Sequence, residues 1–189
     1  MANFTPGKII GNFKSKKGDS VILRYPKWED LDKVLDYINK LSKEDTFVLF
    51  SGETITKEQE AKYLADVFKD MELRNKIVVW AFIKEQLVGI CNVDRIMVGR
   101  ERLKHVGKLG VSVAKDYRGE GIGYELGKRT IKEAKKLSGI KIINLTVFGI
   151  NRVAQNLYSK LGFKQAGTLP KYIFYKGKYI DEIIMYIEL

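Results

Sequence analysis

Three glycines at alternate positions, Gly119, Gly121 and Gly123, mark the segment of this chain best suited to bind a ligand. They follow an apolar run that ends at Val113 and open a segment with helical periodicity. Glycine has no Cβ, so the backbone can approach a ligand closely. Amide groups at a helix N-terminus attract anions, and the loop therefore predicts a diphosphate site.

Two common phosphate-binding patterns do not fit this segment. A Walker A loop would need Gly at position 122 and Ser or Thr at 129, where the chain has Ile122 and Arg129. A dinucleotide fingerprint would need Gly at 124 or 126, where the chain has Tyr124 and Leu126. The pattern that remains is Arg-x-x-Gly-x-Gly over positions 118–123.

A second segment with chemical potential runs from Asn151 to Phe163. Asn151 is predicted to cap a helix that ends at Gly162. Asn151 and Tyr158 are seven residues apart, nearly two helical turns, so they lie on one face. The Tyr158 phenol is protonated at neutral pH and could act as an acid; by position alone, a packed aromatic is the alternative.

Together the two segments resemble the signatures of the GNAT superfamily of N-acetyltransferases. The second reads N-x-x-A-x-x-L-Y-x-K-L-G-F almost position for position, and the order along the chain agrees. The resemblance implies acetyl transfer from acetyl-CoA (coenzyme A) to a primary amine of a small molecule or protein, by direct attack in a ternary complex. A coenzyme A-binding module without turnover is the alternative.

The resemblance also implies roles for individual residues. Tyr158 is the candidate acid for the departing thiolate, and Asn151 doubles as cap and cofactor contact. Backbone groups of the strand before the loop pair with the pantetheine arm, although its valines also suit an ordinary core. The expected cofactor contacts are Val111, Ser112, Val113, Arg118, Gly119, Glu120, Gly121, Ile122, Gly123, Tyr124 and Asn151.

The general base is left open by the sequence. Many family members carry Glu five positions before the Asn, where this chain has Thr146, and others carry a carboxylate where it has Lys108. The remaining candidates are Asp94, His105 and a chain of ordered water molecules. The chain holds one His, with an ordinary pKa of about 6.5.

Composition and charge limit the class of protein. The net charge is +11, with 19 Lys/Arg against 9 Asp/Glu in residues 91–189 and near balance before them. That half carries the glycine loop, so a polyphosphate ligand would be attracted, but a lysine-rich surface explains the excess equally well. Nucleic-acid motifs and metal-ligand spacings are absent, so neither partner is expected.

Cysteine and hydropathy point to a cytoplasmic protein. Cys91 is the single Cys, so an internal disulfide cannot form, and we expect a buried, inert thiol. The longest apolar run, 77–83, is too short to span a bilayer, and no membrane association is expected. The sequence leaves open whether the chain forms a homodimer.

Periodicity predicts one α/β domain over residues 20–189, preceded by an arm at 1–19 that is either loose or a short edge strand. The expected fold is of GNAT type: a central, mixed, mostly antiparallel twisted sheet flanked by helices, in the order β-α-α-β-β-β-α-β-α-β-β. The expected strands are 20–24, 77–84, 87–94, 106–113, 141–148, 172–175 and 179–187; the expected helices are 28–41, one beginning at the Thr56–Gln59 capping box, 121–137 and one from Asn151.

The acceptor amine is expected to meet the first helices and the final hairpin. Aromatic residues that could line this cleft, although core packing suits most of them better, are Trp28, Phe47, Phe50, Phe174 and Tyr175. The basic run Arg95, Arg100, Arg102 and Lys104 suits an acceptor that carries a carboxylate, with a solvated hairpin as the alternative.

Overall fold

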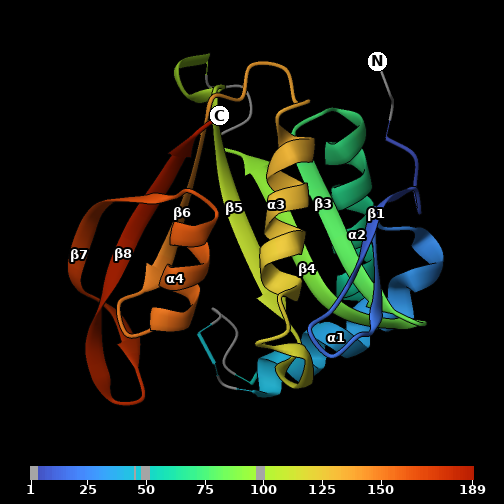
Figure 1. Cartoon of the computed structure of the whole chain (residues 1–189), viewed down its shortest axis with the longest axis horizontal. Helices are drawn as coiled ribbons and strands as arrows, with labels where there is room; N and C mark the ends of the chain where they lie inside the picture. The colour runs from blue at the N-terminus through green and yellow to red at the C-terminus, as the bar shows by residue number, and fades with distance from the viewer. Residues whose placement is uncertain (1–3, 45, 48–51, 97–100) are drawn as a thin grey trace.

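Strand β3 (Lys76–Ile83) is apolar along nearly its whole length and is buried on both faces, as a central strand must be. It lies in an eight-stranded sheet with the order β1-β2-β3-β4-β5-β6-β8-β7. Neighbouring strands are antiparallel except β5 and β6, which are parallel. This computed structural model describes residues 4–44, 46–47, 52–96 and 101–189 (Figure 1).

The remaining elements follow the predicted order, with one strand added at the N-terminus. Their bounds are β1 Ile9–Lys14, β2 Ser20–Arg24, α1 Leu31–Lys43, α2 Lys57–Glu72, β4 Gln86–Arg95, β5 Val106–Val113, α3 Ile122–Ala134, β6 Ile142–Phe148, α4 Arg152–Lys160, β7 Lys164–Tyr175 and β8 Lys178–Glu188.

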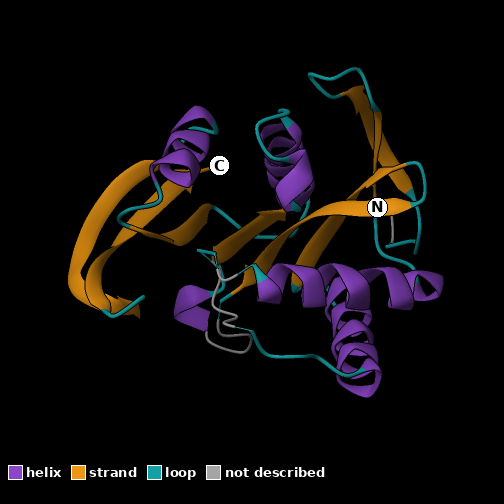
Figure 2. Cartoon of the chain, turned by 90° about the horizontal axis from the view of Figure 1, so that it is seen from below, coloured by secondary structure: helices purple, strands orange, loops and turns teal. Residues whose placement is uncertain are grey.

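Helices cover both faces of the sheet (Figure 2). Tyr37 of α1 reaches Ser112 of β5, whereas Gly123 of α3 approaches the side chain of Val113. Because adjacent residues of a strand point to opposite faces, α1 and α3 lie on opposite sides of β5. We call these sides the α1 face and the α3 face.

Local capping explains where two of the helices begin. The Thr56 side chain accepts a hydrogen bond from the Gln59 amide, and the Gln59 side chain accepts one from the Thr56 amide, as the predicted capping box requires. Asn151 accepts from the Ala154 amide at 3.1 Å and so begins α4. Gly162, just past α4, has φ 96°, which favours glycine over other residues.

The segment 1–19 includes a short edge strand, β1, which pairs with β2; this is one of the two forms expected for the segment. Several boundaries differ from those expected. The β3–β4 turn lies at 84–85 instead of 85–86, because Gln86 already pairs with Ile83. Helix α3 stops at Ala134, after which the amide of Leu137 turns back to the Ala134 carbonyl.

Strand β7 is much longer than the predicted 172–175, since it begins at Lys164. Its sequence contains Gly167 and Pro170, which weaken a strand signal. The structure accommodates them with register shifts against β8, and the Lys171 amide there donates to the Asp181 carboxylate.

Cys91 lies in the centre of the sheet with no exposed surface, as the sequence predicts. Burial raises the pKa of its thiol to about 12. Within the described residues, no helix is long and apolar enough to cross a membrane.

Candidate functional site

Strands β5 and β6 are paired over only part of their length. Their register ends at Lys108 opposite Asn144, although β5 continues to Val113 and β6 to Phe148. On its other edge β5 stays paired with β4 up to Val113 opposite Gly89. Residues 109–113 of β5 and 145–148 of β6 do not pair with each other. We call the space between them the β5–β6 opening, and it widens towards the start of α3 (Figure 1).

Backbone groups on the edge of β5 face this opening. The Ala114 amide donates to the Val88 carbonyl of β4, and the groups of a strand alternate between its two edges. Ser112 therefore also directs its backbone to β4, whereas Val111 and Val113 direct theirs to the opening. Of the three predicted contacts on this strand, the two valines can offer backbone hydrogen bonds to a ligand.

The loop after β5 has the geometry of an anion site. Gly119 and Gly121 have φ of 80° and 85°, and a Cβ added at either would meet only open space. Gly121 is the N-cap of α3, and no side chain caps this helix, unlike α2 and α4. The first amides of α3, at Ile122 and Gly123, are thus positioned to bind an anion.

Two charged side chains of the loop are engaged elsewhere. The Arg118 Nε donates to the Val113 carbonyl at 2.9 Å, and its guanidinium pairs with Glu44 at the end of α1. The Glu120 carboxylate pairs with Lys17 at 2.6 Å, and this ion pair lowers the pKa of Glu120. The Glu120 carbonyl accepts from the Lys16 amide, so the Glu120 amide is the group of this residue that can meet a ligand.

Tyr158 of α4 is 7% exposed and packs edge-on against Phe163, with ring centroids 6.0 Å apart. Burial, with a smaller contribution from Cys91, raises the pKa of Tyr158 above its ordinary value. The phenol therefore keeps its proton at any physiological pH. Since a free thiol has a pKa of about 8.5, Tyr158 is better suited to hydrogen-bond a thiolate than to transfer its proton completely.

The α1 face of the opening is accessible. Thr146 is exposed although β6 is an interior strand, whereas its neighbours Leu145 and Val147 on the α3 face are buried. At this end of β6, the rings of Phe148, Phe47 and Tyr175 pack against one another, with centroids 5.6 to 5.7 Å apart. The opening thus has an apolar wall on the side of the final hairpin.

A model of the acetyltransferase (GNAT) family matches residues 35–163, which include the opening, the glycine loop and α4. This match covers more than half of the chain. The chain belongs to the acetyltransferase (GNAT) family. Acetyl-CoA is the co-substrate of this family, and the uncapped start of α3, the two glycines and the unpaired edge of β5 fit a diphosphate on an extended arm.

Individual GNAT proteins are similar to this chain. The N-alpha-acetyltransferase of Sulfurisphaera tokodaii is 27% identical over 84% of this chain and 89% of its own length. The L-amino acid N-acetyltransferase AaaT of Escherichia coli is 31% identical over 56% of this chain, which spans 64% of that protein. A GNAT acetyltransferase structure from Streptococcus pneumoniae superposes with a TM-score of 0.81, at 27% identity over 89% of this chain and 99% of that one.

The candidate bases lie away from the open end of this GNAT site. Asp94 is opposite Lys108, at the closed end of the opening, and is 3.4 Å from the Lys76 amine. Four residues of strand, about 13 Å, separate Lys108 from Ser112. His105 precedes β5, and eight residues of strand, about 26 Å, separate it from Val113.

The basic excursion after β4 is also remote from the glycine loop, because it joins β4 and β5 at their other end. The Arg95 side chain donates to the carbonyls of Lys104 and Ser138. Lys104 pairs with Glu101 at 2.7 Å. Arg102 is exposed, and Arg100 lies outside the described residues. These contacts explain Arg95 and Lys104 without an acceptor.

The predicted acceptor aromatics divide into three groups. Phe47 and Tyr175 meet at the opening, as described above. Trp28 packs on Phe68 of α2, and Phe174 packs on Tyr179 of the hairpin. Phe50 lies outside the described residues.

Two residues at the opening were missed from the sequence, Tyr37 and Glu44. Tyr37 is buried in the centre of the apolar stripe of α1, between Val34 and Leu41. Its spacing of three and four residues from those positions is a signal that would have placed it on the buried face. Glu44 follows the end of α1, and no sequence pattern connects it with Arg118.

Proposed function

We propose that this chain transfers an acetyl group from acetyl-CoA to a primary amine of a small molecule or protein, by direct attack in a ternary complex. The observation that carries this proposal is the β5–β6 opening, which ends at an uncapped helix N-terminus behind two positive-φ glycines. A pantetheine arm needs an unpaired strand edge, and a diphosphate needs free amides. In this chain the edge of β5 that faces the opening is followed by the first amides of α3.

The proposed roles follow from the position of each group. The first amides of α3 and the backbone of 119–124 bind the diphosphate, while Val111 and Val113 hold the pantetheine arm. A backbone amide directed at the carbonyl oxygen stabilises the charge that develops there, typically worth about a hundredfold or more in rate. Holding both reactants together removes the entropic cost of their encounter.

In the transfer itself, the amine nitrogen bonds to the carbonyl carbon, and the carbon–sulfur bond breaks. The amine proton leaves through ordered water to bulk solvent on the exposed α1 face. Tyr158 donates a hydrogen bond to the departing thiolate, and the thiolate takes up a proton from solvent water as the thiol forms.

The acceptor amine approaches from the α1 face beside Thr146 and the Phe47–Phe148–Tyr175 wall. The two similar proteins cited above are named for an L-amino acid and for an N-alpha group. Amino acids and peptides with free N-termini are therefore the first acceptors to test.

The test mixes the protein with acetyl-CoA and a panel of amines, measures free thiol, and identifies the product by mass. We expect Tyr158→Phe to lower kcat about a hundredfold while acetyl-CoA still binds. Tyr25→Phe is the matched control, because it removes another buried phenol, one that donates to Glu133 at 2.8 Å. Thiol release unaffected by Tyr158→Phe would reject the role of that residue.

A coenzyme A-binding module without turnover is the second candidate. It is favoured because the chain has Thr146 where many family members have a glutamate base. The Glu44 carboxylate does not replace that base, because it is paired with Arg118. Calorimetric binding of acetyl-CoA without thiol release over a broad amine panel would support this alternative. An absence of binding heat would reject both candidates.

A further inference from the structure

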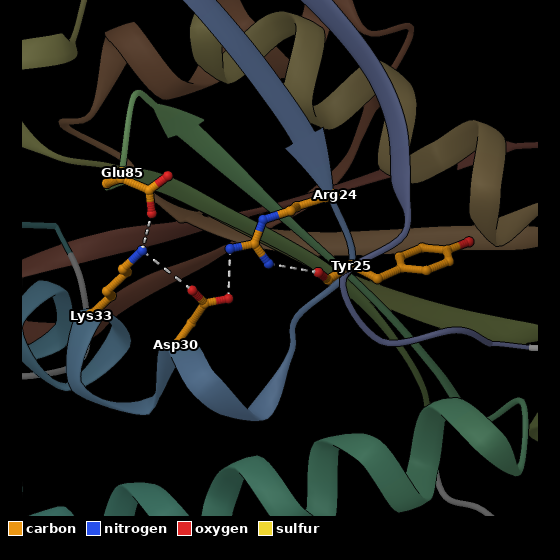
Figure 3. A network of polar contacts seen from close by, with 5 residues as sticks. All are labelled: Arg24, Tyr25, Asp30, Lys33 and Glu85. Atoms are coloured by element: carbon orange, nitrogen blue, oxygen red, sulfur yellow. Dashed lines mark hydrogen bonds and ion pairs between the residues drawn. The ribbon is translucent and has the colours of Figure 1, made fainter.

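Helix α1 is fastened to the sheet at its N-terminal end by a charge network centred on the buried Asp30 carboxylate (Figure 3). The Asp30 carboxylate, 1% exposed, accepts from Arg24 at 2.6 Å and lies 3.6 Å from the Lys33 amine. Lys33 also pairs with Glu85 in the β3–β4 turn, and Arg24 donates to the Tyr25 carbonyl. This end of α1 is thereby held to β2 and to the β3–β4 turn.

The middle and the C-terminal end of α1 are fastened to β5. The hydroxyl groups of Tyr37 and Ser112 are 2.8 Å apart, and Tyr37 is 4% exposed. Nearly two turns further on, Glu44 pairs with Arg118, whose Nε donates to the Val113 carbonyl. Two side-chain links therefore join α1 to the last residues of β5.

These links lie where β5 is no longer paired with β6. Beyond Lys108, strand β5 is paired with β4 alone, because β6 has turned away. The backbone groups of Val111 and Val113, which face the opening, thus belong to a strand supported on one edge. Ser112 stands between them, and its side chain is the one that Tyr37 holds.

We propose that Tyr37 is a positioning residue for acyl transfer, which holds the unpaired end of β5 in place through the Ser112 hydroxyl. This inference rests on the function proposed above. Tyr37 touches neither reacting group. It substitutes for the missing strand by tying β5 to a helix that is itself anchored at Asp30.

The test compares Tyr37→Phe, Ser112→Ala and the double variant with wild type by two measurements. The first is amide hydrogen exchange over residues 109–114 in the ligand-free protein. The second is kcat and KM with acetyl-CoA and an acceptor found by the amine panel. Tyr25→Phe is the control, since its hydroxyl bond to Glu133 has the same length and lies on another part of the fold.

Loss of one neutral hydrogen bond is expected to speed exchange over 109–114 about fivefold in both single variants. We expect kcat to fall about tenfold with KM for acetyl-CoA changed less than twofold, because misplaced backbone groups penalise the transition state. The double variant should equal the single ones. Tyr25→Phe should lower thermal stability without either effect.

Unchanged exchange over 109–114 in Tyr37→Phe would overturn the inference, as would fully additive effects of the two substitutions. Loss of activity in Tyr25→Phe equal to that in Tyr37→Phe would also overturn it, since the effect would then be general destabilisation. A wild-type chain that releases no thiol would reject the proposed function instead, while the exchange measurement still decides whether Tyr37 holds β5.

Discussion

Glu60 of α2 is an ionisable residue that the proposed chemistry does not use. Its side chain is 4% exposed, and its Oε1 atom has no hydrogen-bond partner within the described residues. Burial raises the pKa of Glu60 to about 7. An exposed Glu titrates near pH 4.3, so the folded state keeps a proton that the unfolded state has released over the pH range between these values.

The expected consequence is a loss of stability as the pH rises. Below about pH 4.3 the folded and unfolded states both hold the proton, so the charge of Glu60 does not lower stability. Between that value and about pH 7 the folded state binds more protons than the unfolded state, so the free energy of unfolding decreases as the pH rises. Glu60→Gln should therefore stabilise the protein by about 2–3 kcal/mol at pH 8 and by almost nothing at pH 4. Urea unfolding at both pH values measures the difference.

Glu72→Gln is the control for this prediction, because Glu72 lies exposed at the end of the same helix. The difference between the two pH values should be much smaller for Glu72→Gln than for Glu60→Gln, because Glu72 is not buried. If Glu60→Gln behaved in the same way as this control, the raised pKa of Glu60 would be wrong.

At the scale of elements, the start of α3 differs from the starts of α2 and α4. Thr56 and Asn151 satisfy amides of their own helices, whereas Gly121 has no side chain that could do so. Residue types at these three N-caps thus distinguish two helices capped by a side chain from one, α3, whose first amides have no side-chain cap. The glycine that leaves it open is also the residue that accepts φ 85°.

Gly121→Ala tests this reading of the loop. A left-handed backbone costs a residue with a Cβ roughly 1–2 kcal/mol, so the variant should either lose this stability or rearrange the loop. In both cases we expect coenzyme A affinity to fall at least tenfold, measured by calorimetry. Gly139→Ala is the matched control, with φ 81°, open space around it and a position near the end of α3.

Gly139→Ala should cost similar stability and leave the affinity unchanged. An equal loss of coenzyme A affinity in both variants would mean that destabilisation, and not the geometry of the loop, explains the result.

At the scale of the whole molecule, Cys91 reports on opening of the sheet. Its thiol has no exposed surface and a pKa near 12, so a disulfide reagent should not react with it in the folded chain. The same reagent can therefore measure free coenzyme A in the activity assay without a background from the protein.

Labelling of Cys91 should proceed only through unfolding, and acetyl-CoA should slow it. At a concentration of about 100 times Kd, ligand binding adds about 2.7 kcal/mol, which corresponds to about a hundredfold slower labelling. The measurement is thiol modification in moderate urea with and without acetyl-CoA. Rapid labelling in buffer would contradict the burial of Cys91, and labelling insensitive to acetyl-CoA would contradict its binding to the folded chain.

Local chemistry explains which features could be predicted from the sequence. Glycines 119 and 121 predict a tight loop, Asn151 and Thr56 predict helix starts, and apolar runs predict the interior strands, because each signal depends on neighbours in the chain. The segment of β1 was left with two alternatives, and the full length of β7 was harder to predict, since Gly167 and Pro170 suppress the strand pattern that pairing with β8 restores.

The sequence alone determined the family, the order of elements after β1 and the tight glycine loop, since these depend on residue types at short spacing. Only the tertiary structure decided where β5 and β6 separate, that Val111 and Val113 face the opening, and that Asp94 and His105 lie far from its open end. It also decided that Tyr37 and Glu44 hold β5. Contacts such as Tyr37 with Ser112 join residues 75 positions apart, and no periodicity along a chain encodes which distant strand a helix will cover.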